Sequence, residues 1–311
     1  MPECLQRLIG AICLLALVAA PGFAGEAVRV ATYNVENYLV MDRWLDERDR
    51  WLPEYPKPET EKAALRGVIH SAAPDVIALQ EMGSPPFLRE LQRDLKREGL
   101  DYPYRHVLEA GDEVRHVAVL SKLPFREVTG HTDPDFPYFD GRETIKRGLL
   151  EIGFETAGEE WSLFTLHLKS KWTERDDDPR AERKRTGEAT AARNRILERH
   201  DPEAGDLFVI AGDFNDTRDT PPLRRFLRRG DVRISIPVEA ADSRGHKWTQ
   251  HWERQNLYSR IDFILASPAM KRRLAPDSHG VYDGAGYRLA SDHRLVWADF
   301  QFGGEERQGP E

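Results

Sequence analysis

Short apolar runs, separated by amphipathic stretches, constrain the fold of this chain more than any other feature of its sequence. Runs of this kind are typical of buried strands, and the longer amphipathic stretches are typical of helices. We expect strands at 28–33, 75–80, 104–109, 116–121, 147–154, 161–168, 206–211, 260–266 and 295–302. We expect helices at 59–72, from Ser84 to Gly99, near 180–199 and at 220–229.

This balance of many strands and few helices favours one α/β domain over a doubly wound single sheet. The predicted fold is a four-layer sandwich in which two packed, mostly antiparallel β-sheets are flanked by helices. The mature chain shows no internal repeat and no long Gly/Ser linker that would separate domains. We therefore predict a single domain over residues 25–302, followed by a polar tail at 303–311.

The first 24 residues have the pattern of a secretory signal peptide. Arg7 precedes an apolar run at 8–20, and small residues around Ala24 suit a cleavage site. The run is shorter than the roughly 20 residues that a membrane-spanning helix needs, which disfavours an uncleaved anchor. The sequence therefore predicts a periplasmic or secreted protein without stable membrane insertion.

Composition narrows the chemistry of the mature chain. Both cysteines, Cys4 and Cys13, lie in the predicted signal peptide, which excludes disulfides, thiolate metal sites and a cysteine nucleophile. The 45 basic and 53 acidic residues give a net charge of −8, so the chain as a whole repels nucleic acid and anionic lipid. A metal ion or a local basic patch must hold any phosphate-rich ligand.

Acidic, amide and imidazole side chains recur where the apolar runs stop. In open α/β folds ligands collect beyond the strand ends, so these segments are expected to converge on one cleft. The residues are Asn34, Glu36, Glu81, His167, Asp213, Asn215, Asp262, Asp292 and His293.

Six segments around these residues resemble the successive motifs of the endonuclease/exonuclease/phosphatase superfamily, the metal-dependent phosphoesterases typified by pancreatic deoxyribonuclease. The matches come in the family order and span residues 28 to 302. They are Tyr33-Asn34-Val35-Glu36-Asn37, Ala78-Leu79-Gln80-Glu81, His167-Leu168-Lys169-Ser170-Lys171, Gly212-Asp213-Phe214-Asn215-Asp216, Arg260-Ile261-Asp262-Phe263-Ile264-Leu265 and Ser291-Asp292-His293.

A divalent cation would neutralise the phosphate and orient it for attack. Glu81, an isolated carboxylate after an apolar run, is the first candidate ligand, and the resemblance implies the same role. Asn34 would be a neutral ligand or an orienting amide, and Asp292 could bind metal from the last motif. Glu36 lies where some relatives carry a metal-binding carboxylate. Ligation by oxygen alone indicates Mg²⁺, Mn²⁺ or Ca²⁺. Alternatively, Glu81 caps the following helix and Asn34 completes a turn.

His293 is the candidate general base, because imidazole accepts a proton from water near neutral pH. Asp262 lies inside an apolar run, where a carboxylate is costly to bury without a partner. A hydrogen bond to His293 would provide that partner and fix the histidine tautomer. The structural alternative is an ion pair between Asp262 and Arg260.

The remaining roles follow mainly from the resemblance. It implies that Asp213 positions water or manages leaving-group protonation, that Asn215 donates to a phosphate oxygen, and that His167 stabilises developing charge. Arg147 resembles a phosphate-contacting arginine, and Lys169 lies near the predicted cleft rim. Structural alternatives are an Asx turn for Asp213 and Asn215, a packed His167, and a merely solubilising Lys169.

The sequence thus predicts an exported, divalent-metal-dependent phosphodiesterase that acts on a phosphate ester, with nucleic acid as the first expected substrate. A phospholipid or sphingolipid phosphodiesterase and a phosphomonoesterase are the alternatives, since one site serves all three. The lipid alternative is disfavoured because no long exposed apolar hairpin is visible. A non-catalytic binding module is expected to lack Glu81, Asp213, Asp262 or His293, and this chain has all four. No obligate protein partner is evident.

Overall fold

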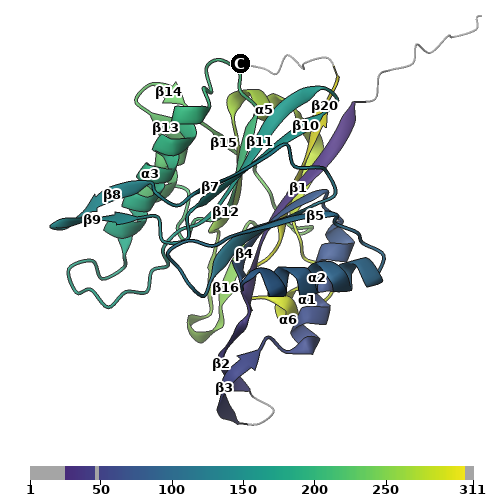
Figure 1. Ribbon diagram of the computed structural model, residues 1–311, viewed down its shortest axis with the longest axis vertical. Coiled ribbons are helices and arrows are strands. Elements are labelled where there is room, and N and C mark those ends of the chain that lie inside the picture. Colours follow the sequence, from purple (N-terminus) through teal and green to yellow (C-terminus); the bar gives the residue numbers. More distant parts are fainter. Residues whose placement is uncertain (1–24, 46–48, 305–311) are drawn as a thin grey trace, which may run out of the picture.

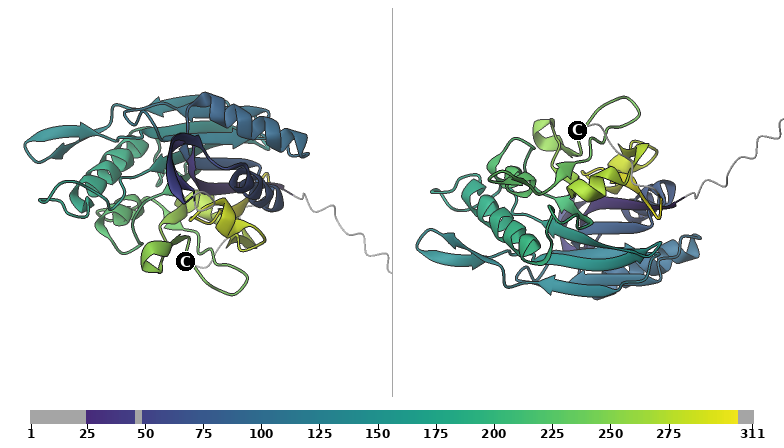
Figure 2. Two further views of the ribbon diagram at one scale, coloured as in Figure 1. Left: turned by 90° about the horizontal axis from the view of Figure 1, so that it is seen from below. Right: turned by 90° about the horizontal axis from the view of Figure 1, so that it is seen from above.

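The computed structural model describes residues 25–45 and 49–304. The predicted signal peptide, and the predicted tail from residue 305 onward, lie outside the described residues. Two six-stranded sheets form the centre of the domain. In Figures 1 and 2, helix α3 and the β8–β9 hairpin lie on one side, and α1 and α2 lie on the other. Among the described residues, no helix combines the length and hydropathy needed to cross a membrane.

The first sheet has the order β19-β20-β1-β4-β6-β5. Its only parallel pair among the described strands is β1–β4, and the chain between them includes helix α1. Helices α2 and α6 also pack against this sheet. The elements are β1 (Glu26–Tyr38), β4 (Val76–Met82), β5 (Tyr104–Leu108), β6 (His116–Ser121), β19 (Leu274–Val281), β20 (Val296–Phe302), α1 (Glu59–Ala72), α2 (Pro85–Arg97) and α6 (Tyr287–Ala290).

The second sheet, of order β15-β18-β12-β11-β10-β7, repeats this plan. Strands β11 and β12 are parallel, and α3 connects them, since parallel neighbours need a long crossover. The elements are β7 (Glu127–His131), β10 (Leu149–Thr156), β11 (Glu159–His167), β12 (Phe208–Asp213), β15 (Ile236–Pro237), β18 (Asp262–Ala266), α3 (Glu182–Arg199), α4 (Pro221–Leu227) and α5 (Pro268–Arg272).

Four small hairpins extend from the sandwich. The β2–β3 hairpin carries Trp44 and Trp51, whose exposed fractions are 45% and 64%. Charged residues separate the two tryptophans in sequence, so this aromatic hairpin was not recognisable as an apolar stretch. The hairpins are β2 (Val40–Leu45) with β3 (Arg50–Pro56), β8 (Asp135–Tyr138) with β9 (Gly141–Thr144), β13 (Arg228–Arg229) with β14 (Val232–Arg233), and β16 (Gln250–Trp252) with β17 (Leu257–Ser259), the last enclosing a 3₁₀ turn at Glu253–Gln255.

Both faces of each central strand are buried, which explains the unbroken apolar runs of the sequence. In β4, Val76 and Ala78 belong to the core between the sheets. Ile77 and Leu79 point the other way, into the core formed with α1 and α2. Strand β12 divides its side chains in the same manner, so four layers bury three apolar cores.

The predicted four-layer sandwich is confirmed, and all nine predicted strands are present, β6 with the predicted bounds and the other eight with shifted bounds. Helix α1 has the predicted bounds, whereas α4 ends at Leu227 because the chain enters β13. Strands β7 and β19 were missed because exposed polar residues interrupt their apolar pattern. Residues 134–139, which are rich in aromatic side chains, contain the whole of β8, and Phe136 and Tyr138 are buried in the core beside α3.

Two glycines provide a matched test of this packing. A Cβ at Gly212 would lie 2.1 Å from the Leu166 carbonyl oxygen, whereas a Cβ at Gly67 meets nothing within 4 Å. Gly212→Ala should lower the free energy of unfolding by about 1–3 kcal/mol, because the backbone of β11 cannot yield. Gly67→Ala, in the exposed middle of α1, should raise it by about 0.5–1 kcal/mol. Chemical denaturation measures both, and equal effects would contradict this packing.

Candidate functional site

The parallel pairs bring the predicted site residues to one end of the sandwich. In the second sheet, His167 lies opposite Asp213, and Asp213 lies opposite Asp262. In the first sheet, the ends of β1 and β4 place Asn34 near Glu81. Segments far apart in sequence therefore meet where the two sheets face each other.

His293 and Asp262 form the predicted pair. Nδ1 of His293 lies 2.9 Å from Oδ2 of Asp262 and 3.1 Å from Oδ1. Both side chains are buried, and the hydroxyl of Thr249 accepts hydrogen bonds from the N–H groups of Ile261 and Asp262. The alternative partner, Arg260, donates instead to the carbonyls of Val238 and Ala240. Nε2 of His293 has no hydrogen-bond partner among the described residues and faces a cavity at this end of the sandwich.

Asp213 is the centre of the buried hydrogen-bond network. Its Oδ2 accepts from Nδ2 of Asn34 at 3.0 Å and lies 3.4 Å from Nε2 of His167. Its Oδ1 accepts from the N–H of Asn215, so the Asx turn exists, and one carboxylate oxygen still points to the site. Burial, and then the charge of Asp262, raise the pKa of Asp213 to about 7.

Glu81 is held by two neighbours from β1. Its Oε1 accepts from Nδ2 of Asn34 at 3.3 Å, and its Oε2 accepts from the N–H of Asn37 at 3.1 Å. The amide oxygen of Asn34 accepts from the N–H of Glu36. This orientation supports the orienting role of Asn34. Helix α2 starts after Ser84, so Glu81 does not cap it.

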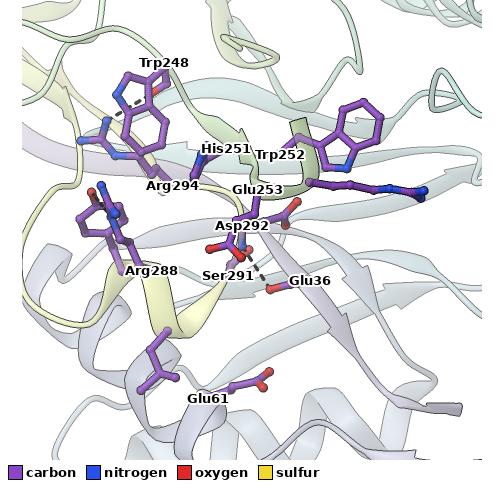
Figure 3. A pocket seen from close by; sticks show the side chains of 13 residues that line it. Glu36, Glu61, Trp248, His251, Trp252, Glu253, Arg288, Ser291, Asp292 and Arg294 are labelled. Carbon is purple, nitrogen blue, oxygen red and sulfur yellow. Dashed lines mark hydrogen bonds between the residues drawn. The ribbon is translucent and has the colours of Figure 1, made fainter. Parts of the chain in front are cut away.

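Glu36 and Asp292 close the other side of the site. Figure 3 shows the two residues meeting beside a second cavity, where the N–H of Asp292 donates to Glu36 Oε2 at 3.1 Å. Farther along that cavity, Arg294 stacks on Trp248 at 4.2 Å. Nε2 of Gln250 donates to Asp292. Burial, and then Asp292, raise the pKa of Glu36 to about 7.

The predicted phosphate-binding residues lie on the opposite side. His167 is buried, its Nδ1 has no hydrogen-bond partner among the described residues, and burial keeps its pKa well below the usual range. Arg147 donates from Nε to Asp112 at 3.0 Å and from Nη1 to the Leu168 carbonyl. Nζ of Lys169 donates to the hydroxyl of Ser170 at 3.2 Å.

One cavity of about 670 Å³ joins the predicted residues. Asn34 and Asp262 are hydrogen-bonded to two residues that line it, Asp213 and His293 respectively. The predicted residues that line it are Glu36, Glu81, Arg147, His167, Lys169, Asp213, Asn215, Asp292 and His293. Sequence reasoning missed Asn37, Arg115, Lys146, Trp172 and Gln250, which also line it. Asn37 belongs to a recognised motif, but the other four stand in segments that carry no distinctive pattern.

The donor set fits a hard divalent cation. Glu36, Glu81, Asp213 and Asp292 line one cavity and offer the carboxylate oxygens that such a cation prefers, and burial, followed by a neighbouring carboxylate, raises the pKa of Glu36 and of Asp213. Oxygens of Asp213, Asp262 and a nitrogen of His293 also lie within 4.8 Å of one another. Asp262 is buried and hydrogen-bonded to His293, so Glu81 and Asp292 are more accessible to a metal ion than Asp262 is.

Comparisons with known proteins identify the family and the fold of this chain. The model of the Endonuclease/Exonuclease/phosphatase family matches residues 31–293. A search of curated proteins found no match. Among solved structures, that of the endonuclease/exonuclease/phosphatase from Bacteroides vulgatus has a TM-score of 0.63 and 17% identity, covering 89% of this chain and 99% of that chain.

Two further structures share the fold. The human Nocturnin catalytic domain with bound sulfate anion has a TM-score of 0.63 and 16% identity, covering 89% of this chain and 94% of that chain. The beta toxin of Staphylococcus aureus has a TM-score of 0.56 and 17% identity, covering 87% of this chain and 99% of that chain. At these identities the similarity establishes a common fold.

The raised pKa values predict how metal affinity depends on pH. Glu36 and Asp213 line the same cavity as Glu81 and Asp292, and their deprotonation adds negative charge beside a bound cation, so binding should strengthen as pH rises through about 7. The loss of one proton on metal binding corresponds to about tenfold weaker binding at pH 6 than at pH 8. Calorimetric titration with Mn²⁺ would measure this, and an affinity that does not change with pH would contradict it.

Proposed function

Because the chain belongs to the endonuclease/exonuclease/phosphatase family, whose members are metal-dependent phosphoric ester hydrolases, we propose that it is a phosphodiesterase that cleaves nucleic acid. The observation that carries this proposal is the convergence of the His293–Asp262 pair, Asp213 and Glu81 on one cavity. A binding module that had lost its chemistry would have no reason to keep this arrangement.

We propose Glu81 and Asp292 as metal ligands, with Asn34 orienting Glu81. When bound, Mg²⁺, Mn²⁺ or Ca²⁺ would neutralise the phosphate and polarise its oxygens. His293 takes the proton of the attacking water at Nε2, while Asp262 holds the proton on Nδ1. Asp213 orients Asn34, Asn215 and His167 toward the phosphate, since it contacts all three.

The protonation state of His293 sets the pH dependence. Burial alone would lower its pKa, but Asp262, Asp292 and Asp213 outweigh burial and raise the pKa well above its usual range. The base must be neutral to accept a proton, so kcat/KM should rise with pH. A cation on the neighbouring carboxylates would offset their charge and bring this pKa down.

A lipid phosphodiesterase is the second candidate, and one observation favours it. Of the exposed tryptophans, Trp172 and Trp252 line the two cavities at the site, and Trp44 and Trp51 lie on the hairpin that follows β1 directly. Tryptophan is suited to the boundary between lipid and water. The net charge of −8 also disfavours a tight nonspecific nucleic-acid binder.

Parallel assays separate these candidates. Purified mature protein with Mg²⁺, Mn²⁺ or Ca²⁺ should degrade plasmid DNA or RNA faster than sphingomyelin vesicles or a simple phosphomonoester. Chelation should abolish the activity, and Glu81→Gln should sharply weaken its dependence on metal, because the ligand keeps its shape and loses its charge. Turnover of sphingomyelin alone would favour the second candidate, and full activity in excess chelator would reject the metal mechanism.

The histidine and aspartate should act as a unit. His293→Ala and Asp262→Asn should each lower kcat by about 10²–10⁴, and the double variant should be little worse than His293→Ala. Circular dichroism must confirm folding, because a buried partner left unpaired can destabilise the chain. Folded variants with wild-type turnover would show that the pair is structural, and multiplicative losses would show that the two residues act independently.

We also propose that the protein is exported, from the charged start, apolar run and small-residue region of residues 1–24. Mass spectrometry of periplasmic or secreted protein should find an N-terminus near Gly25. An intact N-terminus on protein confined to the cytosol would be incompatible with export.

A further inference from the structure

Positive charge gathers along part of the catalytic cavity. The carboxylates of Glu36, Glu81 and Asp292 come from the strand ends of the first sheet. The same cavity is lined by four cations, which we call the cationic shelf and which begin at Arg115, 4.0 Å from Glu81: Arg115, Lys146, Arg147 and Lys169. Three of these four follow or precede strands of the second sheet, and only Arg147 and Lys169 have a predicted role.

Asp112 organises one end of the shelf. Its Oδ1 accepts from the N–H groups of Val114 and Arg115, and its Oδ2 accepts from Nε of Arg147 at 3.0 Å. The guanidinium of Arg115 is fixed separately, because its Nε donates to Oδ1 of Asn37 at 2.7 Å. One buried carboxylate therefore holds the backbone of one arginine and the side chain of the other.

Glu188 organises the other end of the cationic shelf. This fully buried residue of α3 accepts from the N–H of Lys146 at 3.3 Å and from the N–H of Lys169 at 2.7 Å. Burial raises the pKa of Glu188, and the N–H of Lys169 opposes that rise. Its oxygens thus fix the two backbone segments and leave both lysine side chains to the cavity.

Among residues 25–45 and 49–304, the two lysines of the shelf, Lys146 and Lys169, have no ion-pair partner, whereas Arg147 pairs with Asp112 at 3.0 Å and Arg115 lies 4.0 Å from Glu81. The ammonium of Lys169 donates only to neutral oxygens of Ser170 and Trp172. Both arginines lie close enough to His167 to lower its pKa further after burial has done so. The shelf therefore adjoins the centre of the chemistry.

We propose that the cationic shelf binds a second phosphate group, adjacent to the one that is hydrolysed. This inference rests on the proposed function and deepens it, because a nucleic-acid strand brings a neighbouring phosphate to the shelf and an isolated phosphodiester does not. Lysine and arginine form charge-assisted hydrogen bonds with phosphate, and each such bond favours substrates that carry the extra group. The enzyme then prefers strands over single phosphodiesters.

The binding test uses two ligands that differ by one phosphate, adenosine 3′,5′-bisphosphate and adenosine 5′-monophosphate. Each ligand is titrated calorimetrically, in the presence of Mg²⁺, into the full mature chain carrying His293→Ala. This substitution suppresses hydrolysis during the measurement. The bisphosphate should bind at least about tenfold more tightly, the size expected for one charge-assisted hydrogen bond. Adding Lys146→Ala or Lys169→Ala should remove most of this preference.

Lys96→Ala is the matched control, since Lys96 is an exposed lysine of α2 paired with Asp101. It should leave the preference unchanged. Equal affinity of the His293→Ala protein with an intact shelf for the two ligands would overturn the proposal. So would an equal loss of affinity for both ligands in Lys146→Ala, because the shelf would then hold only the phosphate that reacts.

A kinetic test separates this inference from the proposed function. In Lys146→Ala, the ratio of kcat/KM for a single-stranded oligonucleotide to that for bis(p-nitrophenyl) phosphate should fall about tenfold. The slope of log(kcat/KM) against log salt for the oligonucleotide should also become shallower by about 0.7. Wild-type enzyme that ignores nucleic acid while preferring the bisphosphate would overturn the nuclease proposal and leave the shelf standing. A ratio and a slope that Lys146→Ala does not change would overturn the shelf.

Discussion

The whole of this site has to accommodate repulsion between neighbouring carboxylates. Asp213 and Asp262 are buried and lie opposite each other in adjacent strands, and half-buried Glu36 lies against half-buried Asp292. Like charges in such places are unfavourable unless hydrogen bonds, a proton or a cation compensate them. The protein supplies His293 to Asp262 and two amides to Asp213, and a cation in the cavity would compensate the carboxylates that remain.

The fold makes this concentration of charge possible by aligning strand ends. Each sheet contains one parallel pair, and the chain between its two strands includes a helix, so the carboxyl ends of both pairs reach the same end of the sandwich. Local backbone strain refines the placement. Glu36, Asn37, Glu81 and Asn215 all have positive φ angles, a conformation that costs a residue other than glycine about 1–2 kcal/mol. The hydrogen bonds around them offset that cost.

Much of the site was predictable because its residues directly follow or interrupt apolar runs. Asp262 is a clear example, since a carboxylate inside a buried strand requires a partner. Arg115 and Glu188 gave no such signal: their importance depends on hydrogen bonds to residues that are distant in sequence. The β2–β3 hairpin was missed for a related reason, because its tryptophans alternate with charged residues and its exposure is a tertiary property.

The pairing of β1 with β20 has a consequence for the order of events during synthesis. Glu26 lies opposite Phe302, and Arg29 is bound by Asp299 through two hydrogen bonds, so the first strand of the domain is completed by the last. His293 lies three residues before the start of that last strand at Val296. A ribosome must therefore translate almost the entire chain before His293 can meet Asp262, so a chain that ends before residue 293 lacks this pair and the strand that completes the first sheet.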